Sequence, residues 1–325
     1  ADGQVDGRWG GALGLRVSVR GRANPLALED IFAIESRLPE GTARGPFGFD
    51  LSDEGFLLDF QNTELTSDLG GIRAEGALFL GGGIGFRDLA MEMTDLDLSV
   101  TDPWVQDTLP LRGRMTGSLS LAGDLDELAV EGLIDLANPD STGTLTADIV
   151  GTMGFNEGFS ASSLLVTLAP LEWRALSSVS PSMTLRGPGS VRVELNGSLY
   201  GAGLVINAAD LTHVPRGLGR PVLAETDRAG APTSGSAEGA SLVSLRGRVR
   251  RDSTNLFLNL TGDLQPLSLT TLRRSFPGLP FQGEYTGTVN LDGPVSALRA
   301  SADLETSGGP LTVSGRFDAT RIADA

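Results

Sequence analysis

Few residues in this chain are suited to acid–base or nucleophilic chemistry. His213 is the only histidine, and Asp210 lies close before it, so the two could form a general-base pair. No motif connects a nucleophile to this pair, and a partly exposed structural role is the simpler prediction for His213. Acidic pairs such as Asp53 with Glu54 and Asp95 with Asp97 could cleave a polysaccharide if the two acids stood about 5 Å or 6.5–9.5 Å apart in space. The sequence does not supply that separation, so a polysaccharide-cleaving β-helix stays open as an alternative.

Composition removes most other chemistries. All 25 basic residues are arginine, and cysteine is absent. Without lysine there is no P-loop lysine or Schiff base, and without cysteine there is no thiol nucleophile and no ordinary zinc site. The glycine-rich residues 81–88 resemble a calcium-binding repeat, but their aspartate is displaced and the motif does not recur, which predicts a turn. We therefore expect no catalytic residues, no metal, no cofactor and no enzymatic activity.

Charge and hydropathy narrow the possible partners. The chain has 325 residues and a net charge of −16, which disfavours binding to nucleic acid. It has 44 glycines and only 6% aromatic residues, a balance that suits many short strands joined by tight turns. No apolar run approaches the roughly 20 residues of a membrane-spanning helix. No signal peptide is visible and the chain starts in what resembles the middle of a repeat, so we interpret it as a piece of a longer protein.

Strict alternation of apolar and polar residues recurs along the chain, for example over residues 15–20, 96–100, 191–195 and 256–260. Such alternation predicts strands with one dry and one wet face. Several predicted strands end in glycine at a fixed offset, at Gly21, Gly123, Gly197, Gly262 and Gly293. Glycine there is typical of a tight turn or a bulge after the strand.

A longer motif repeats four times and begins at Gly41, Gly113, Gly187 and Gly283, with spacings of 72, 74 and 96 residues. It has the form Gly-x-x-x-Gly followed by alternating apolar residues, shortened in the third copy. The long spacing contains residues 216–240, a Gly/Ala/Ser/Pro-rich stretch that we interpret as a flexible loop insert. Repetition at this period predicts a modular array in which each unit packs on its neighbours.

Short helical segments precede the motif copies. Residues 102–108, 171–178 and 269–276 have helical character, as residues 28–36 do more weakly, and each segment is followed by proline. We therefore predict one continuous repeat array over residues 1–325, with units starting near 28, 100, 170 and 267. The expected fold is mainly β: an elongated, repetitive antiparallel β-groove, resembling a taco or solenoid, with helices of one to two turns between repeats.

The dry face of this sheet is the candidate functional surface. If the sheet curls without closing, its apolar side chains line a groove suited to the acyl chains of phospholipids, since each buried CH₂ contributes about 0.8 kcal/mol. The predicted lining residues are Val17, Val19, Leu96, Leu98, Leu119, Leu121, Val191, Val193, Leu195, Leu256, Leu258, Leu260, Val289 and Leu291. If the sheet instead closes into a sandwich or β-helix, the same residues form an ordinary core, and the chain is a structural or adhesive stalk.

The repeat resembles that of the AsmA/TamB superfamily of bacterial envelope proteins. The resemblance is carried by the short helix, proline and Gly-x-x-x-Gly lead-in and by the strands that follow, in residues 267–304 and again in residues 96–136. Weaker copies cover most of the chain, and the match is to a family style of repeat rather than to one protein.

The resemblance implies an apolar β-groove that crosses the periplasm and is anchored in the inner membrane by an N-terminal helix, a segment not recognisable here. Members are implicated in moving phospholipid to the outer membrane, and some act with an outer-membrane barrel protein in outer-membrane biogenesis. The C-terminal domain that docks on the barrel is not recognisable here either. The family supplies no catalytic residues to carry over.

Overall fold

The computed structural model describes most of the chain as strands. The described residues are 2–9, 15–27, 40–52, 55–101, 113–137, 144–155, 158–174, 185–214, 239–273 and 282–319. The side chains of residues 2–9, 15, 16, 101 and 144 are not described. Several sequence predictions lie outside the described residues: the helical segments 28–36 and 102–108, the later parts of segments 171–178 and 269–276, the acidic pair Asp53 and Glu54, and nearly all of the insert 216–240.

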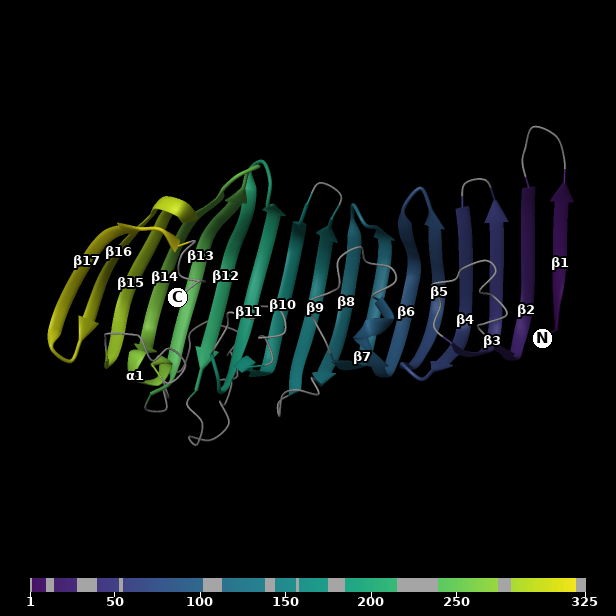
Figure 1. The fold of residues 1–325 in the computed structure, drawn as a ribbon, viewed down its shortest axis with the longest axis horizontal. Helices are drawn as coiled ribbons and strands as arrows, with labels where there is room; N and C mark the ends of the chain where they lie inside the picture. Colours follow the sequence, from purple (N-terminus) through teal and green to yellow (C-terminus); the bar gives the residue numbers. More distant parts are fainter. Residues whose placement is uncertain are drawn as a thin grey trace. The chain divides into compact units, whose positions relative to one another are not determined.

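Seventeen strands alternate in direction along the described chain, and the antiparallel pairs join strands that are consecutive in sequence (Figure 1). In the first part of the chain they are β1 Asp2–Trp9, β2 Leu15–Ala27, β3 Gly41–Ser52, β4 Gly55–Ser67, β5 Gly70–Gly81, β6 Ile84–Asp97, β7 Arg114–Asp124, β8 Leu128–Ala137 and β9 Thr144–Gly154. In the second part they are β10 Ser160–Glu172, β11 Pro188–Ser198, β12 Gly203–His213, β13 Ser241–Arg251, β14 Leu256–Ser268, β15 Glu284–Pro294, β16 Leu298–Thr306 and β17 Gly309–Phe317.

The chain divides into two compact units. The first comprises residues 1–142 and 147–156, and the second comprises residues 143–146 and 157–325. Antiparallel pairing runs without interruption from β1 to β8 in the first unit and from β10 to β17 in the second. The predicted fold class, a mainly β protein built as an open, repetitive antiparallel sheet with very short helices, is confirmed.

The repeated motif marks a period of four strands. Its copies open β3, β7, β11 and β15, and the insert lies between β12 and β13. The second glycine of three copies falls inside a strand and has a positive φ: Gly45 at 117°, Gly117 at 144° and Gly287 at 132°. A Cβ at Gly117 would lie 2.1 Å from the carbonyl oxygen of Leu133 on β8, so only glycine fits.

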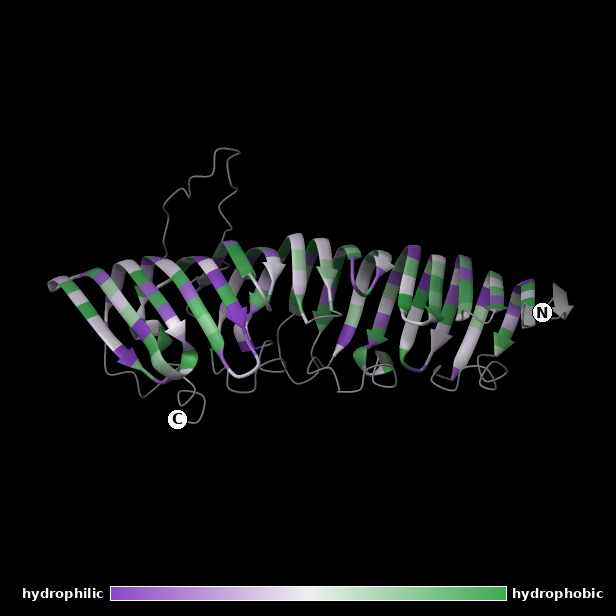
Figure 2. Cartoon of the chain, turned by 90° about the horizontal axis from the view of Figure 1, so that it is seen from above, coloured by the Kyte–Doolittle hydropathy of each residue, from purple (hydrophilic) through white to green (hydrophobic). Residues whose placement is uncertain are grey.

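These glycines and a series of β-bulges bend the strands. Register shifts occur in most neighbouring pairs, for example between Met93 and Leu96 on β6 and between Leu264 and Leu267 on β14. A bulge adds one residue to one strand, which bends it and increases its twist. The strands of each unit accordingly arch along their length in Figure 2.

Short helices follow two of the strands that end a repeat. η3 spans Leu98–Thr101, and α1 spans Leu269–Leu272 with Ser268 as its N-cap. Helix α1 lies within the predicted helical segment 269–276. A third short helix, η5, spans Val295–Ala297. The same backbone hydrogen bond recurs at three joints, where an N–H donates to the first glycine of the next motif: Leu98 to Gly113 at 3.0 Å, Trp173 to Gly187 at 3.0 Å and Leu269 to Gly283 at 2.9 Å.

Three local predictions are wrong. Strand β6 ends at Asp97, and Leu98 begins a 3₁₀ helix, because the Asp97 carboxylate caps the turn by accepting the N–H of Ser99 at 2.9 Å. Gly21 and Gly262 lie inside β2 and β14 rather than after them. A Cβ at Gly262 would lie 2.8 Å from the terminal Cδ2 of Leu245 on the neighbouring strand, so the Leu245 side chain would have to shift to admit one. The turn predicted near residues 81–88 is confirmed as the β5–β6 hairpin.

Candidate functional site: the apolar face of the sheet

In the second unit the strand register gathers apolar residues on one face of the sheet. Residues directly opposite in an antiparallel pair share a face. One such row runs through all eight strands and contains only apolar residues and glycine: Val166, Val193, Ala209, Leu245, Gly262, Val289, Ala302 and Val313. The next row is of the same kind: Leu164, Leu195, Ile206, Gly247, Leu260, Leu291, Ala300 and Gly315.

The first unit has a corresponding apolar face. One row joins Val19, Phe49, Leu58, Leu78 and Phe86 across β2 to β6. Further rows cross from β6 to β8: Leu89 with Leu121 and Val130, Met91 with Leu119 and Gly132, and Leu96 with Met115 and Leu136. Figure 2 shows the resulting alternation of hydrophobic and hydrophilic residues along the strands.

The predicted lining residues fall on these faces, with one exception. All eight of them in the second unit, and Val17, Val19, Leu96, Leu119 and Leu121 in the first, share the apolar face by register. Leu98 does not lie on a strand. Leu96 is buried, while the other predicted residues are half-buried. Their role in lining a groove stays a prediction.

The apolar face is open to solvent at β17. Val313 is 50% exposed and Leu311 is 36% exposed, although both share the apolar face with Ala302 and Leu304 of β16. Within the described part of the chain, the extensive contacts of each strand are with its neighbours in the sheet. Within the described residues, no strand pairing joins β10 to β17 to close the second unit.

The opposite face is polar and carries the ion pairs. Arg20 on β2 bonds to Asp50 on β3 at 2.7 Å, and Arg73 on β5 pairs with Glu64 on β4. The hydrogen bond from Arg20 lowers the pKa of the Asp50 carboxyl below its ordinary value, with a smaller contribution from Ser18. These ion pairs lie at the solvent-facing surface of the sheet and mark its polar face. They do not form a reactive centre.

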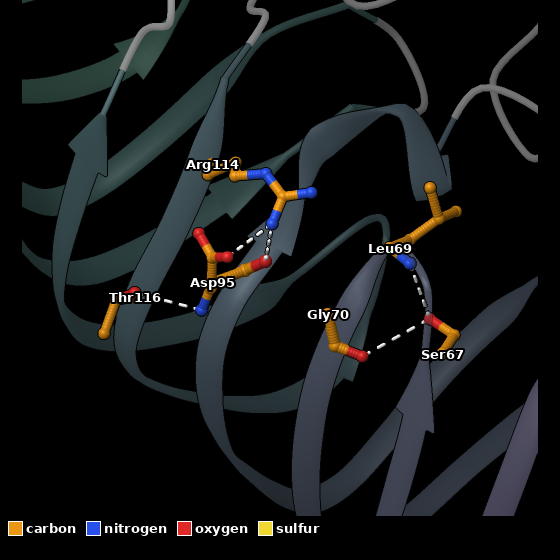
Figure 3. Close-up of polar contacts among 6 residues, drawn as sticks. All are labelled: Ser67, Leu69, Gly70, Asp95, Arg114 and Thr116. Carbon is orange, nitrogen blue, oxygen red and sulfur yellow. Dashed lines mark hydrogen bonds and ion pairs between the residues drawn. The ribbon is translucent and has the colours of Figure 1, made fainter.

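Asp95 and Asp97 both make structural hydrogen bonds in the joint between β6 and β7. Asp95 pairs with Arg114, which also donates to the Asp95 carbonyl oxygen at 3.3 Å, and the Asp95 N–H donates to Thr116 at 3.1 Å (Figure 3). In the neighbouring β4–β5 turn, Ser67 is held by its bonds to Leu69 and Gly70 (Figure 3). Asp97 caps η3. The two carboxylates therefore have structural partners: Asp95 binds an arginine, and Asp97 accepts a backbone N–H. This arrangement accounts for both acids without assigning them to a substrate.

His213 is buried, at 4% exposure, so the prediction of a partly exposed histidine is wrong. Its Nε2 lies 2.9 Å from the carbonyl oxygen of Arg186, and it sits under Gly187 at the start of the third motif copy. Asp210 accepts a hydrogen bond from Ser244 at 2.6 Å on the polar face. Three positions apart on a strand, Asp210 and His213 point to opposite faces, and the conceivable general-base pair does not form.

Other possible sites are sparse. No group of three or more His, Asp or Glu side chains in the described residues could hold a metal ion. A hollow of about 640 Å³ lies beside the β14 bulge and is lined mainly by polar residues, including Gln265, Glu284, Thr286 and Glu305. Among the described residues, the helices are all too short and polar to cross a membrane.

Comparisons with family models, curated proteins and solved structures find no match to this chain. The resemblance to the AsmA/TamB repeat therefore stays a prediction from the sequence.

Several residues of the apolar face were missed by sequence reasoning. Leu89, Met91 and Met93 alternate in the ordinary way, but the bulge after Met93 shifts the alternation before Leu96. Phe49 and Phe86 complete the row of Val19, and their signal was present in the alternation of residues 47–51 and 84–86. A search for alternation that permits one inserted residue would have found them.

Proposed function

We propose that this protein is a segment of an apolar β-groove that carries phospholipid between the inner and outer membranes of a bacterial envelope, or supports outer-membrane biogenesis by that route. The observation that carries the proposal is the unbroken rows of apolar residues on one face of an open sheet. A continuous apolar face of this extent in a folded protein is typical of a surface that binds an apolar ligand.

Acyl chains fit this face better than a compact ligand does. The rows run from strand to strand without a polar interruption, so a chain moving along them keeps apolar contact at each step. Each CH₂ taken from water contributes about 0.8 kcal/mol, and the contacts are individually weak. Weak and repeated contacts allow a lipid to be held while it still moves. The periplasmic location, the inner-membrane anchor and an outer-membrane barrel partner belong to this proposal through the family resemblance alone.

Photo-crosslinking in a bacterial envelope tests the proposal. A photoreactive amino acid at Leu119 or Val193, on the apolar face, is expected to label phospholipid. The matched positions Ser118 and Arg192 are exposed neighbours on the same strands but on the polar face, and they are expected to remain unlabelled. Native mass spectrometry of the purified chain is expected to detect co-purifying phospholipid.

With the photoreactive amino acid at Met91, which lies opposite Leu119 on the apolar face, the double variant Leu119→Arg/Leu121→Arg is expected to lose lipid labelling, because each arginine would place a charge among acyl chains. The control Ser118→Arg/Ser120→Arg adds the same charge to the polar face and is expected to behave as wild type. The milder variant Leu119→Ser/Leu121→Ser serves if the arginine variant does not fold. Equal labelling from both faces, or a well-folded wild type without lipid, contradicts the proposal and favours the stalk.

A further inference from the structure

Strand β13 carries three arginines close to its end, in a chain with a net charge of −16. Arg248 and Arg250 point to the polar face, as the alternation from Val249 requires. Arg251 lies opposite Leu256, at the end of the strand, and therefore belongs to the apolar face. We call Arg248, Arg250 and Arg251 the arginine rim, because they stand on both sides of the sheet edge where β13 turns into β14.

The guanidinium groups of the arginine rim are available for a ligand. Arg248 and Arg251 are exposed and make no side-chain hydrogen bond or ion pair with the described residues. Arg250 lies over the ring of Phe257, with its guanidinium carbon 4.5 Å from the ring centroid, which leaves its N–H groups at the edge. The acid beside the rim, Asp252, accepts the N–H groups of Thr254 and Asn255 in the turn, and its charge also attracts Arg250.

Glycine at position 203 helps to set the arginines in place. A Cβ at Gly203 on β12 would lie 2.9 Å from Cγ and Cδ of Arg248 and 3.2 Å from Cβ of Arg250. The aliphatic stems therefore lie against bare backbone. Stems held in this way lose less conformational entropy when the guanidinium groups bind an anion.

The apolar face begins immediately inside the rim. The pair Arg251–Leu256 is followed by Val249–Leu258 and then by Gly247–Leu260. A ligand that reaches over this edge thus meets positive charge first and apolar side chains next. That order matches a phospholipid with an anionic headgroup, whose phosphate would contact the arginines while its acyl chains lie along the apolar rows.

We propose that the arginine rim binds the headgroup of an anionic phospholipid, such as phosphatidylglycerol, as its acyl chains enter the apolar face of the second unit. This inference rests on the proposed function, since it assumes that the apolar face holds acyl chains. It adds a preference for a class of headgroup and a place where the lipid crosses the edge of the sheet.

Flotation of the full chain with vesicles tests the inference. Wild type is expected to bind vesicles of equal parts phosphatidylglycerol and phosphatidylcholine more tightly than vesicles of phosphatidylcholine alone. Arg248→Gln/Arg251→Gln is expected to weaken binding to the phosphatidylglycerol vesicles about 30-fold, given the usual contribution of each arginine at an anionic surface. The control Arg22→Gln/Arg87→Gln removes the same charge from exposed positions in the first unit and is expected to bind as wild type.

The outcomes separate this inference from the proposed function. Loss of the phosphatidylglycerol preference in the rim variant, with acyl crosslinking at Val193 retained, supports both. An unchanged preference in the rim variant overturns the headgroup inference and leaves the acyl-chain proposal standing if crosslinking persists. Tighter binding of free inorganic phosphate, or of polyglutamate at matched charge, than of phosphatidylglycerol vesicles also overturns it, because the rim would then recognise free phosphate or an acidic protein rather than a lipid headgroup.

Discussion

Single glycines set the curvature of this sheet. Gly117, Gly247 and Gly287 have positive φ values inside strands, at 144°, 140° and 132°. At each position a Cβ would lie within 2.2 Å of a carbonyl oxygen on the next strand. A side chain is therefore excluded both by the backbone conformation and by the neighbouring strand.

Gly287→Ala is expected to destabilise the protein by about 3 kcal/mol, since the added Cβ would meet the Asp303 carbonyl oxygen at 2.2 Å at a strained φ. Urea unfolding followed by circular dichroism measures the change. Gly315→Ala, on β17 of the same unit, has open space around the new Cβ and is expected to change stability by less than about 1 kcal/mol. Equal effects of the two substitutions would show that the bend at Gly287 does not depend on glycine.

The Arg20–Asp50 pair predicts a dependence of stability on pH. Because the hydrogen bond from Arg20 holds the folded-state pKa of Asp50 below its ordinary value of 3.8, the pair stabilises the fold above that value. The contribution disappears as the pH falls through the folded-state pKa. Both side chains are exposed, so Asp50→Asn is expected to cost no more than about 1 kcal/mol at neutral pH and nothing at about pH 2.

The difference in unfolding free energy between wild type and Asp50→Asn, measured in urea at both pH values, checks this expectation. Glu75→Gln removes an exposed carboxylate that makes no ion pair with the described residues, and it serves as the control for net charge. A difference for Asp50→Asn that persists at low pH would mean that the carboxylate charge is not its source.

At the scale of elements, the best-defined polar contacts lie at the joints between repeats. Ser268 is 1% exposed; its Oγ lies 3.4 Å from the N–H of Thr271, and its own N–H donates to Ser241 at 3.0 Å. Thr271 in turn donates to the Gly239 carbonyl oxygen at 2.8 Å. These hydrogen bonds connect the α1 joint to β13, and the backbone bond from Leu269 to Gly283 connects it to the start of β15.

Ser268→Ala is expected to cost about 1–2 kcal/mol, because it removes the helix cap and leaves buried partners unsatisfied. Chemical denaturation gives the value. Ser253→Ala, at an exposed position of the β13–β14 turn, is the matched control and is expected to be neutral. If the two variants unfold alike, the cap does not contribute to stability.

The elements could be predicted from the sequence where local pattern decides them. Alternation identified the strands around Leu119, Val193 and Leu258, and the repeated glycines placed the starts of β3, β7 and β15. Alternation did not reveal that β6 ends at Asp97, since Leu98 continues the pattern and only the cap by Asp97 turns the chain. Gly262 was misplaced because the continuation of β14 beyond it depends on pairing with the two neighbouring strands.

At the scale of the whole molecule, the candidate site depends on strand register, because it consists of rows of paired residues and not of any single residue. The sequence indicated that Val191, Val193 and Leu195 share one face, but not which residues of other strands continue their rows. Strand pairing supplies that information. The arginine rim was missed for the same reason, since Arg251 joins the apolar face only through its pairing with Leu256.

Each unit by itself has a polar face and an opposite face with the apolar rows. The chain as a whole carries a net acidic charge. The arginines of β13 are a local exception to this charge. If the acyl-chain proposal holds, the acidic polar face would disfavour contact with anionic membranes over most of the sheet and leave the rim as a favoured place of contact.

The bends at Gly117, Gly247 and Gly287 lie in the backbone, whereas the ligand would be met by side chains in the rows beside them. Shape and lining are therefore encoded at different positions. Related proteins could exchange valine for leucine or phenylalanine along the rows and so adapt to bulkier or slimmer apolar ligands. The curved shape of the sheet would stay the same. Selection would be expected to hold these glycines fixed and to let the neighbouring apolar positions drift.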